Sequence, residues 1–99
     1  MIVHIVLFKW NYEASQDKID EVMVQLRAMK GNIPGITELS CGVDFTGRAD
    51  GYTHGLLVKF NTKEDLLNYG PHPVHRNVVD NFINPIRESI LAFDYETLE

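Results

Sequence analysis

The first residues of the chain are apolar on both alternating faces of an extended segment. Residues 2–10 carry Val3, Ile5 and Leu7 on one side, and on the other His4 among Ile2, Val6, Phe8 and Trp10. A strand of this kind is typical of the centre of a sheet that is covered on both faces. An amphipathic helix is predicted next, because Ser15 is a suitable N-cap and apolar residues then recur at spacings of three and four up to Met29.

The rest of the chain continues this alternation of elements. A Pro-Gly turn at 33–36 leads into a strand over 37–45, and a polar loop over 44–51 joins it to a strand over 52–60. Thr62 caps a short helix, a second helical piece starts at Pro73, and a last strand covers 90–95. The order predicts an α+β, ferredoxin-like βαββαβ fold with a four-stranded antiparallel sheet, as a single domain over residues 1–99.

One face of the predicted sheet has no helix to cover it. The expected strand order is fourth, first, third, second, and the uncovered face carries Val3, Ile5, Leu7 and Leu57. An exposed apolar sheet face is a large patch by the standards of soluble proteins. The pattern therefore predicts a homodimer through this sheet face, with two sheets packed into a dimeric α+β barrel.

Composition and charge narrow the classes of partner. Fourteen acidic and nine basic residues give a formal charge of -5, and the basic residues are scattered singly. This distribution argues against binding to nucleic acid or to an anionic membrane, and no apolar run approaches the length of a bilayer span. The lone Cys41 is expected to be packed and inert, and we expect a cytoplasmic location.

Four polar residues from four segments are candidates for chemistry. His4 and His54 are each third in their predicted strands, so if those neighbouring strands run parallel the two rings lie at the same level. Tyr69 ends the first of the two helical pieces that cover that face, and His75 lies at the beginning of the second. The pocket would have an apolar wall, predicted to consist of Val6, Phe8, Leu56, Val58 and Phe82. Histidine is a natural general base, and a tyrosine hydroxyl can donate to an oxyanion. The competing interpretation is that the histidines are hydrogen-bonded core residues.

The stretch YGPHPVH over 69–75 also raises the question of a metal. His72 and His75 are three residues apart, but Pro71 and Pro73 flank His72 and favour an extended backbone there. The chain has a single cysteine and no HExxH pattern. We therefore predict no metal site and no cofactor, and we expect His72 to hydrogen-bond nearby backbone at the entry of a helix.

The motifs together resemble a known family. Segments HIVLFKW, IPGI, CGVDFT, GYTHGLLVKF, YGPHPVH and FDYET occur in the order found in the stress-responsive A/B barrel domain (Dabb) family. The resemblance implies a ferredoxin-like fold and a two-fold dimer through the sheets. The family includes a plant polyketide cyclase that works by aldol condensation, and its functional positions match His4, His54, Tyr69 and His75. The resemblance implies that His75 is the base, that Tyr69 is its partner, and that the other two histidines shape or polarise the pocket.

Two functions from different classes remain open from the sequence. The first is an aldol-type cyclase or lyase without a redox cofactor, acting on a small apolar carbonyl ligand through His75 and Tyr69. The second is a non-catalytic dimeric domain that binds a ligand or protects under stress, with structural histidines.

Overall fold

Strands and helices follow one another along residues 1–98, the part of the chain that the computed structural model describes. Glu99, the last residue of the predicted domain, lies outside the described residues. In chain order the elements are β1 (Ile2–Trp10), α1 (Gln16–Arg27), β2 (Ile36–Val43), β3 (His54–Phe60), α2 (Lys63–Tyr69), α3 (Pro73–Val78), the π-helical turn η1 (Val79–Ile83) and β4 (Arg87–Glu96).

The strands form one four-stranded sheet in the order β2-β3-β1-β4, and every neighbouring pair is antiparallel. This confirms the predicted ferredoxin-like fold and the predicted strand order. β4 begins three residues before the apolar segment that starts at Ile90, because pairing of its backbone with β1 does not require apolar side chains.

The level predicted for two of the histidines is wrong. His54 lies opposite Phe8, four positions along β1 from His4, and His4 lies opposite Val58. The reason is the direction of the central strands. β3 follows β2 through a hairpin loop and runs opposite to it, whereas the crossover through α1 makes β1 parallel to β2. The two imidazoles are therefore offset along the sheet instead of facing each other.

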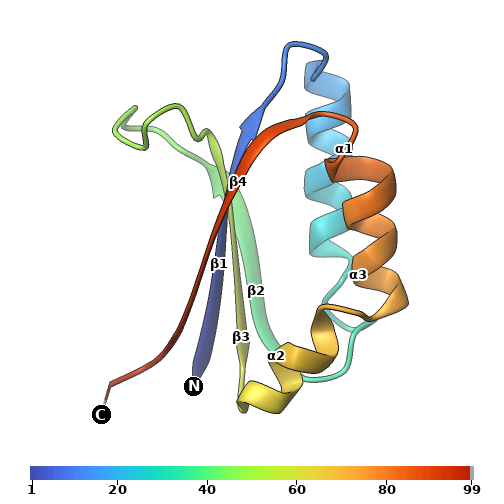
Figure 1. Ribbon diagram of the computed structural model, residues 1–99, viewed down its shortest axis with the longest axis vertical. Helices are drawn as coiled ribbons and strands as arrows, with labels where there is room; N and C mark the ends of the chain where they lie inside the picture. Colours follow the sequence, from blue (N-terminus) through green and yellow to red (C-terminus); the bar gives the residue numbers. More distant parts are fainter. Residues whose placement is uncertain (99) are drawn as a thin grey trace.

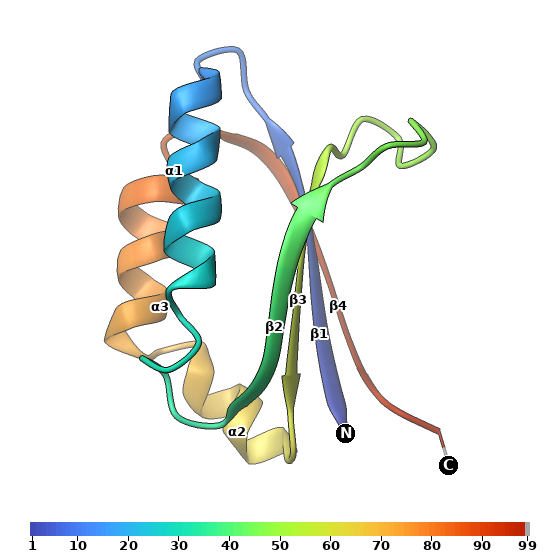
Figure 2. The same cartoon turned by 180° about the vertical axis from the view of Figure 1, so that it is seen from behind.

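All the helices lie on one face of the sheet (Figures 1 and 2). The predicted caps are confirmed: Ser15 Oγ accepts from the backbone N–H of Lys18, and Thr62 Oγ1 accepts from that of Asp65. The core lies between the helices and this covered face, and its most enclosed side chains are Phe8, Phe60, Leu26, Met29, Val22, Val58 and Val78.

Within residues 1–98, the helices are too short or too polar to pass through a bilayer.

The other face of the sheet carries no helix, and we call it the open face (Figures 1 and 2). Leu91, Phe93 and Tyr95 of β4 point to it and are 52%, 62% and 40% exposed. They lie opposite Leu7, Ile5 and Val3 of β1. Leu7 and Ile5 are partly exposed and continue the apolar surface across the sheet, whereas Val3 is only 1% exposed. The open face is thus an apolar area that this chain leaves uncovered.

The division between a packed and an exposed side of α1 yields a stability prediction. Leu26→Ala removes a side chain that is 1% exposed, so we expect the free energy of unfolding to fall by about 2–5 kcal/mol. Val24→Ala on the same helix is the matched control, because Val24 is 46% exposed and should change it by less than about 0.5 kcal/mol. Urea unfolding followed by circular dichroism measures the free energy of unfolding of both variants. Equal losses of this free energy would contradict the packing described.

Candidate functional site

A cavity of about 140 Å³ lies between the covered face of the sheet and the helices. Its polar walls are His4 from β1, Tyr69 from the end of α2, and His75 from α3. The remaining walls are apolar and come from the sheet, α1, α3 and η1: Val6, Phe8, Leu26, Leu56, Val78, Val79, Ile83 and Ile90. Three of the four predicted polar residues therefore meet at one cavity.

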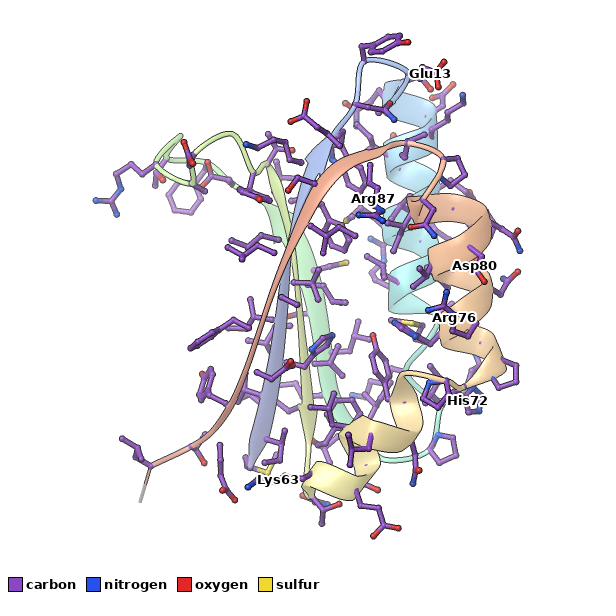
Figure 3. The ribbon with its side chains drawn as sticks, viewed as in Figure 1. Glu13, Lys63, His72, Arg76, Asp80 and Arg87 are labelled. Carbon is purple, nitrogen blue, oxygen red and sulfur yellow. The ribbon has the colours of Figure 1, made fainter. Side chains whose placement is uncertain are left out.

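The joint between α2 and α3 brings Tyr69 and His75 together. His72, which Figure 3 labels beside α3, is the N-cap of that helix. Its Nδ1 accepts from the backbone N–H of Val74 at 3.1 Å, while Pro73 occupies the first turn. This confirms the prediction that His72 bonds to nearby backbone at a helix entry. The joint sets the Tyr69 and His75 ring centroids 4.3 Å apart.

One hydrogen bond fixes the protonation of the His75 ring. His75 Nδ1 lies 2.7 Å from the carbonyl oxygen of Gly70. A carbonyl only accepts, so Nδ1 carries the proton and the neutral ring keeps its lone pair on Nε2. Burial lowers the pKa of His75, and the charge of Arg76 acts in the same direction, although the Gly70 carbonyl opposes them. Near neutral pH the ring is therefore neutral, its Nε2 can act as a base, and its orientation is fixed.

Tyr69 is held as a neutral hydroxyl. It is 2% exposed, and its ring also packs edge-on against Phe60 and His4, with centroids 5.3 and 5.5 Å away. Burial raises the pKa of Tyr69 far above its ordinary value, and the negative charge of Asp94 raises it further. The phenol therefore keeps its proton and can donate a hydrogen bond inside the cavity.

His4 has a carboxylate partner that the sequence motifs did not single out. His4 Nδ1 pairs with Oδ1 of Asp94, which lies directly opposite on β4. The side chain of His4 is 13% exposed, and that of Asp94 is 47% exposed. A carboxylate that accepts from Nδ1 orients the ring and leaves Nε2 on the opposite edge. The pairing register of β1 and β4 is the signal that identifies Asp94.

His54 does not line this cavity. Its Nδ1 accepts from the indole N–H of Trp10 at 2.9 Å, and the hydroxyl of Thr53 lies 2.8 Å from the same nitrogen. An indole N–H only donates, so His54 Nδ1 is unprotonated. Burial lowers the pKa of His54, opposed by the charge of Asp20 on α1. These contacts tie the start of β3 to the end of β1.

The predicted apolar wall is found in part. Val6, Phe8 and Leu56 line the cavity, but Val58 and Phe82 do not. Val58 is fully buried within the core. Phe82 belongs to the π-helical turn, where the residue spacing departs from the α-helical period, and it lines a separate hollow together with Lys18 and Glu21 of α1.

A metal ion requires several donor side chains around one point. Among residues 1–98, no three His, Cys, Asp or Glu side chains are grouped so that they could hold a metal ion.

Comparison with known sequences identifies related proteins. Residues 2–97 match the family model described as Stress responsive A/B Barrel Domain, which confirms the resemblance seen in the motifs. A stress-response A/B barrel domain-containing protein of Arabidopsis thaliana is 33% identical over 96 residues, which make up 96% of this chain and 36% of that protein. Olivetolic acid cyclase of Cannabis sativa is 27% identical over 96 residues, 95% of this chain and 94% of its own length. The chain spans 36% and 46% of two Arabidopsis relatives that it matches.

Solved structures show the same fold. The hydroxynitrile lyase from Passiflora edulis is 28% identical with a TM-score of 0.86, over 99% of this chain and 96% of that one. A protein from Thermobifida fusca, described as a dimeric ferredoxin-like protein of unknown function, is 25% identical with a TM-score of 0.85, over 97% and 90% of the two chains.

The bond between Trp10 and His54 yields a prediction about titration. Trp10→Phe removes the N–H that stabilises the neutral ring, so we expect the pKa of His54 to rise. Titration of the histidine ring protons by NMR measures this, and His75, which has no contact with Trp10, serves as the internal control in the same spectra. An unchanged His54 titration would show that the indole does not set its protonation.

Proposed function

Since the chain belongs to the stress responsive A/B barrel domain family, we propose that it is an acid–base enzyme acting on a small apolar carbonyl compound. The observation that carries the proposal is the hydrogen bond from His75 Nδ1 to the Gly70 carbonyl. It holds the ring at the cavity wall with Nε2 unprotonated, beside a tyrosine that remains a neutral donor. A fixed base and a fixed donor at one apolar cavity suit proton abstraction next to a carbonyl group.

The proposed step begins with His75. Its Nε2 takes a proton from the carbon next to the substrate carbonyl, and the electron pair of that C–H bond moves onto the carbonyl oxygen. The Tyr69 hydroxyl donates a hydrogen bond to the resulting oxyanion. The enolate then attacks a second carbonyl carbon, and the proton on His75 passes to the new alkoxide. His4, whose ring is oriented by Asp94, provides a further polar group at the same wall of the cavity.

The same groups serve a lyase reaction. From a hydroxyl adduct of a carbonyl compound, His75 would take the hydroxyl proton, the carbon–carbon bond would break as the carbonyl re-forms, and the leaving carbanion would accept the proton. A cyclase and a lyase are among the relatives, as the names olivetolic acid cyclase and hydroxynitrile lyase state. These relatives support the class of reaction that we propose. The substrate of this chain is itself part of the proposal.

The size of the cavity supports a compact substrate. Its 140 Å³ corresponds to about five water molecules at their volume in the liquid. Cavities for drug-sized ligands measure roughly 300–1,000 Å³. A small aldehyde or ketone therefore suits this space better than a linear polyketide.

The role of His75 as the base can be tested without knowledge of the natural substrate. We expect the protein to catalyse exchange of the α-hydrogens of cyclohexanone in D₂O, followed by proton NMR. His75→Gln should lower the exchange rate constant by about 10²–10⁴-fold, and Tyr69→Phe by about 10²–10³-fold. Because burial lowers the pKa of His75 from the ordinary value of histidine, the rate constant should be level through neutral pH and fall on the acid side.

His72→Asn is the matched control for this assay, because it changes the neighbouring histidine while leaving a favoured N-cap acceptor at the start of α3. This control variant should catalyse the exchange of the cyclohexanone α-hydrogens at the wild-type rate. Exchange no faster than in buffer alone, or undiminished in His75→Gln, would contradict the proposal.

The second candidate is a non-catalytic dimeric domain with structural histidines. The observation that favours it is that His54 and His72 use their Nδ1 atoms for bonds within the fold. Binding of cyclohexanone that shifts the NMR signals of the cavity residues without any catalysed exchange would support this function over the first.

We also propose that the protein is a two-fold homodimer through the open face, in the cytoplasm. The support is the exposure of Leu91, Phe93 and Tyr95 on that face and the description of a Thermobifida fusca relative as dimeric. The lone Cys41 fits a reducing compartment. Covering the open face with an identical one would remove its apolar side chains from water.

The dimer is tested by sedimentation equilibrium at micromolar concentration. We expect twice the 11.3 kDa mass of one chain. Phe93→Asp places a charge in the proposed interface and should yield monomers, because an unpaired buried charge is strongly unfavourable. Val24→Asp, on the exposed side of α1, should remain dimeric. A monomeric wild-type protein would contradict this proposal.

A further inference from the structure

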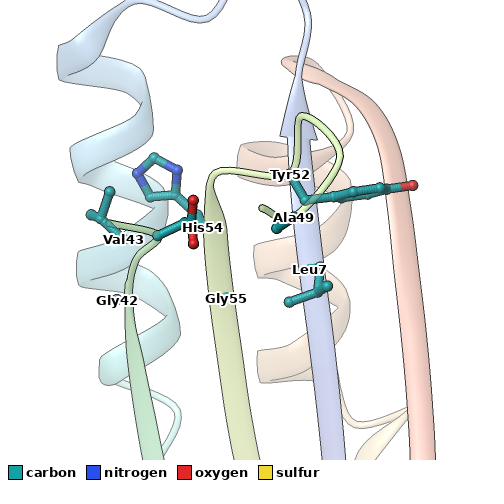
Figure 4. A pocket seen from close by; sticks show the side chains of 8 residues that line it. Leu7, Gly42, Val43, Ala49, Tyr52, His54 and Gly55 are labelled. Atoms are coloured by element: carbon teal, nitrogen blue, oxygen red, sulfur yellow. The ribbon is translucent and has the colours of Figure 1, made fainter. Parts of the chain in front are cut away.

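The cavity of the candidate site is so small that one side chain can decide what fits in it. It measures about 140 Å³, whereas the hollow at the hairpin end of the sheet, which Figure 4 shows, measures about 290 Å³. An apolar cavity of about 150 Å³ holds one benzene molecule. The ring of a single phenylalanine placed in the cavity would therefore leave no room for a substrate.

The α-helical period would bring such a ring to the cavity. His75 and Val78 of α3 and Val79 at the start of η1 line it, at spacings of three and four residues. An α-helix that continued past Val79 would present Phe82 and Ile83, three and four positions later, on the same face. In the structure Ile83 lines the cavity and Phe82 does not.

The π-helical turn is what separates these two neighbours. The backbone N–H of Asn84 donates to the carbonyl of Val79 at 2.9 Å, five residues back instead of four. The chain rotates less at each residue of this wider turn, so Ile83 stays on the face of Val79 while Phe82 is turned to the side. Phe82 thereby reaches the separate hollow against α1.

Both ends of the π-helical turn are anchored. At one end it continues α3 directly. Beyond the other end, the backbone N–H of Asn11 donates to the carbonyl of Ile86 at 2.8 Å, and the side-chain amide of Asn11 donates to the carbonyls of Pro85 and Arg87 at 3.4 and 3.5 Å. A bond of the π type encloses one residue more than an α-helical bond. The turn therefore accommodates the whole length of chain between two fixed points.

We infer that η1 sets the size of the substrate by holding Phe82 outside the cavity. With the π-helical turn in place, η1 contributes Val79 and Ile83 to the wall, and the space left suits a ketone about as large as one six-membered ring. With an α-helical turn, the ring of Phe82 would fill that space. The identity of the ligand as a ketone rests on the proposed function, and the residues that limit its size are the addition.

Deletion of Asn84 tests the role of the π-helical turn. The segment is then one residue shorter, so we expect an α-helical turn with Phe82 at the cavity. The probe is benzene, whose binding depends on room and not on acid–base chemistry, followed by the NMR signals of the cavity methyl groups. The dissociation constant of benzene should rise at least about tenfold. Deletion of the exposed Arg48 from the hairpin loop is the matched control, with wild-type binding expected.

Removal of the ring tests whether Phe82 is the cause. Phe82→Ala combined with the Asn84 deletion should restore the binding of benzene. In the intact chain, Ile83→Ala should favour cyclooctanone over cyclohexanone about tenfold more than the wild type does, because the larger cavity takes up two more methylene groups. Phe82→Ala in the intact chain removes a larger side chain from outside the cavity, so it should leave this ratio unchanged.

Several outcomes would overturn the inference. One is a folded Asn84 deletion, verified by near-ultraviolet circular dichroism, that binds benzene as the wild type does or that Phe82→Ala does not rescue. Another is a ratio of ketone affinities that changes in Phe82→Ala and not in Ile83→Ala, which decides the matter even where the deletion does not fold. A wild-type protein without benzene binding would also overturn it. The expected benzene results without any exchange of cyclohexanone hydrogens would contradict the proposed function and leave the role of η1 standing.

Discussion

One layer of helices covers only one face of a four-stranded sheet, and this constraint organises the whole molecule. The covered face forms the core and, where the joint between α2 and α3 stands over β1, it leaves a small cavity instead of a filled interior. The open face keeps its apolar side chains at the surface. The two faces therefore have different tasks: the covered face positions polar groups away from bulk water, and the open face is suited to association with another surface.

Within the covered face, the proposed chemistry depends on the hydrogen-bonding groups that orient each imidazole. The Gly70 carbonyl and the Asp94 carboxylate each take the Nδ1 side of a ring, His75 and His4 respectively. His72 and His54 also use Nδ1, but as an acceptor of a backbone or indole N–H. The same residue type thus serves as a wall of the cavity in two places and as a structural tie in two others. The hydrogen bonds around each histidine, more than its spacing in the sequence, decide which of these two roles it has.

Periodicity and capping predicted the elements well, because both are local properties. Strand order followed from the general topology, and Ser15, Thr62 and His72 were identified from their immediate neighbours. The positions that depend on register were not predicted. The offset of His54 and the pairing of Asp94 with His4 both require knowledge of which residues face each other across strands. Phe82 was misplaced because a π-helical turn changes the spacing locally.

The central claim is that each face of the sheet has its own function, and a crystal structure of the protein grown with cyclohexanone tests it most directly. The account predicts a two-fold dimer packed through the open faces. It also predicts one ketone in each covered cavity, with its oxygen within hydrogen-bond distance of the Tyr69 hydroxyl and its α-carbon facing His75 Nε2. A dimer formed through the helices, or a ketone bound elsewhere with the cavity closed, would contradict it.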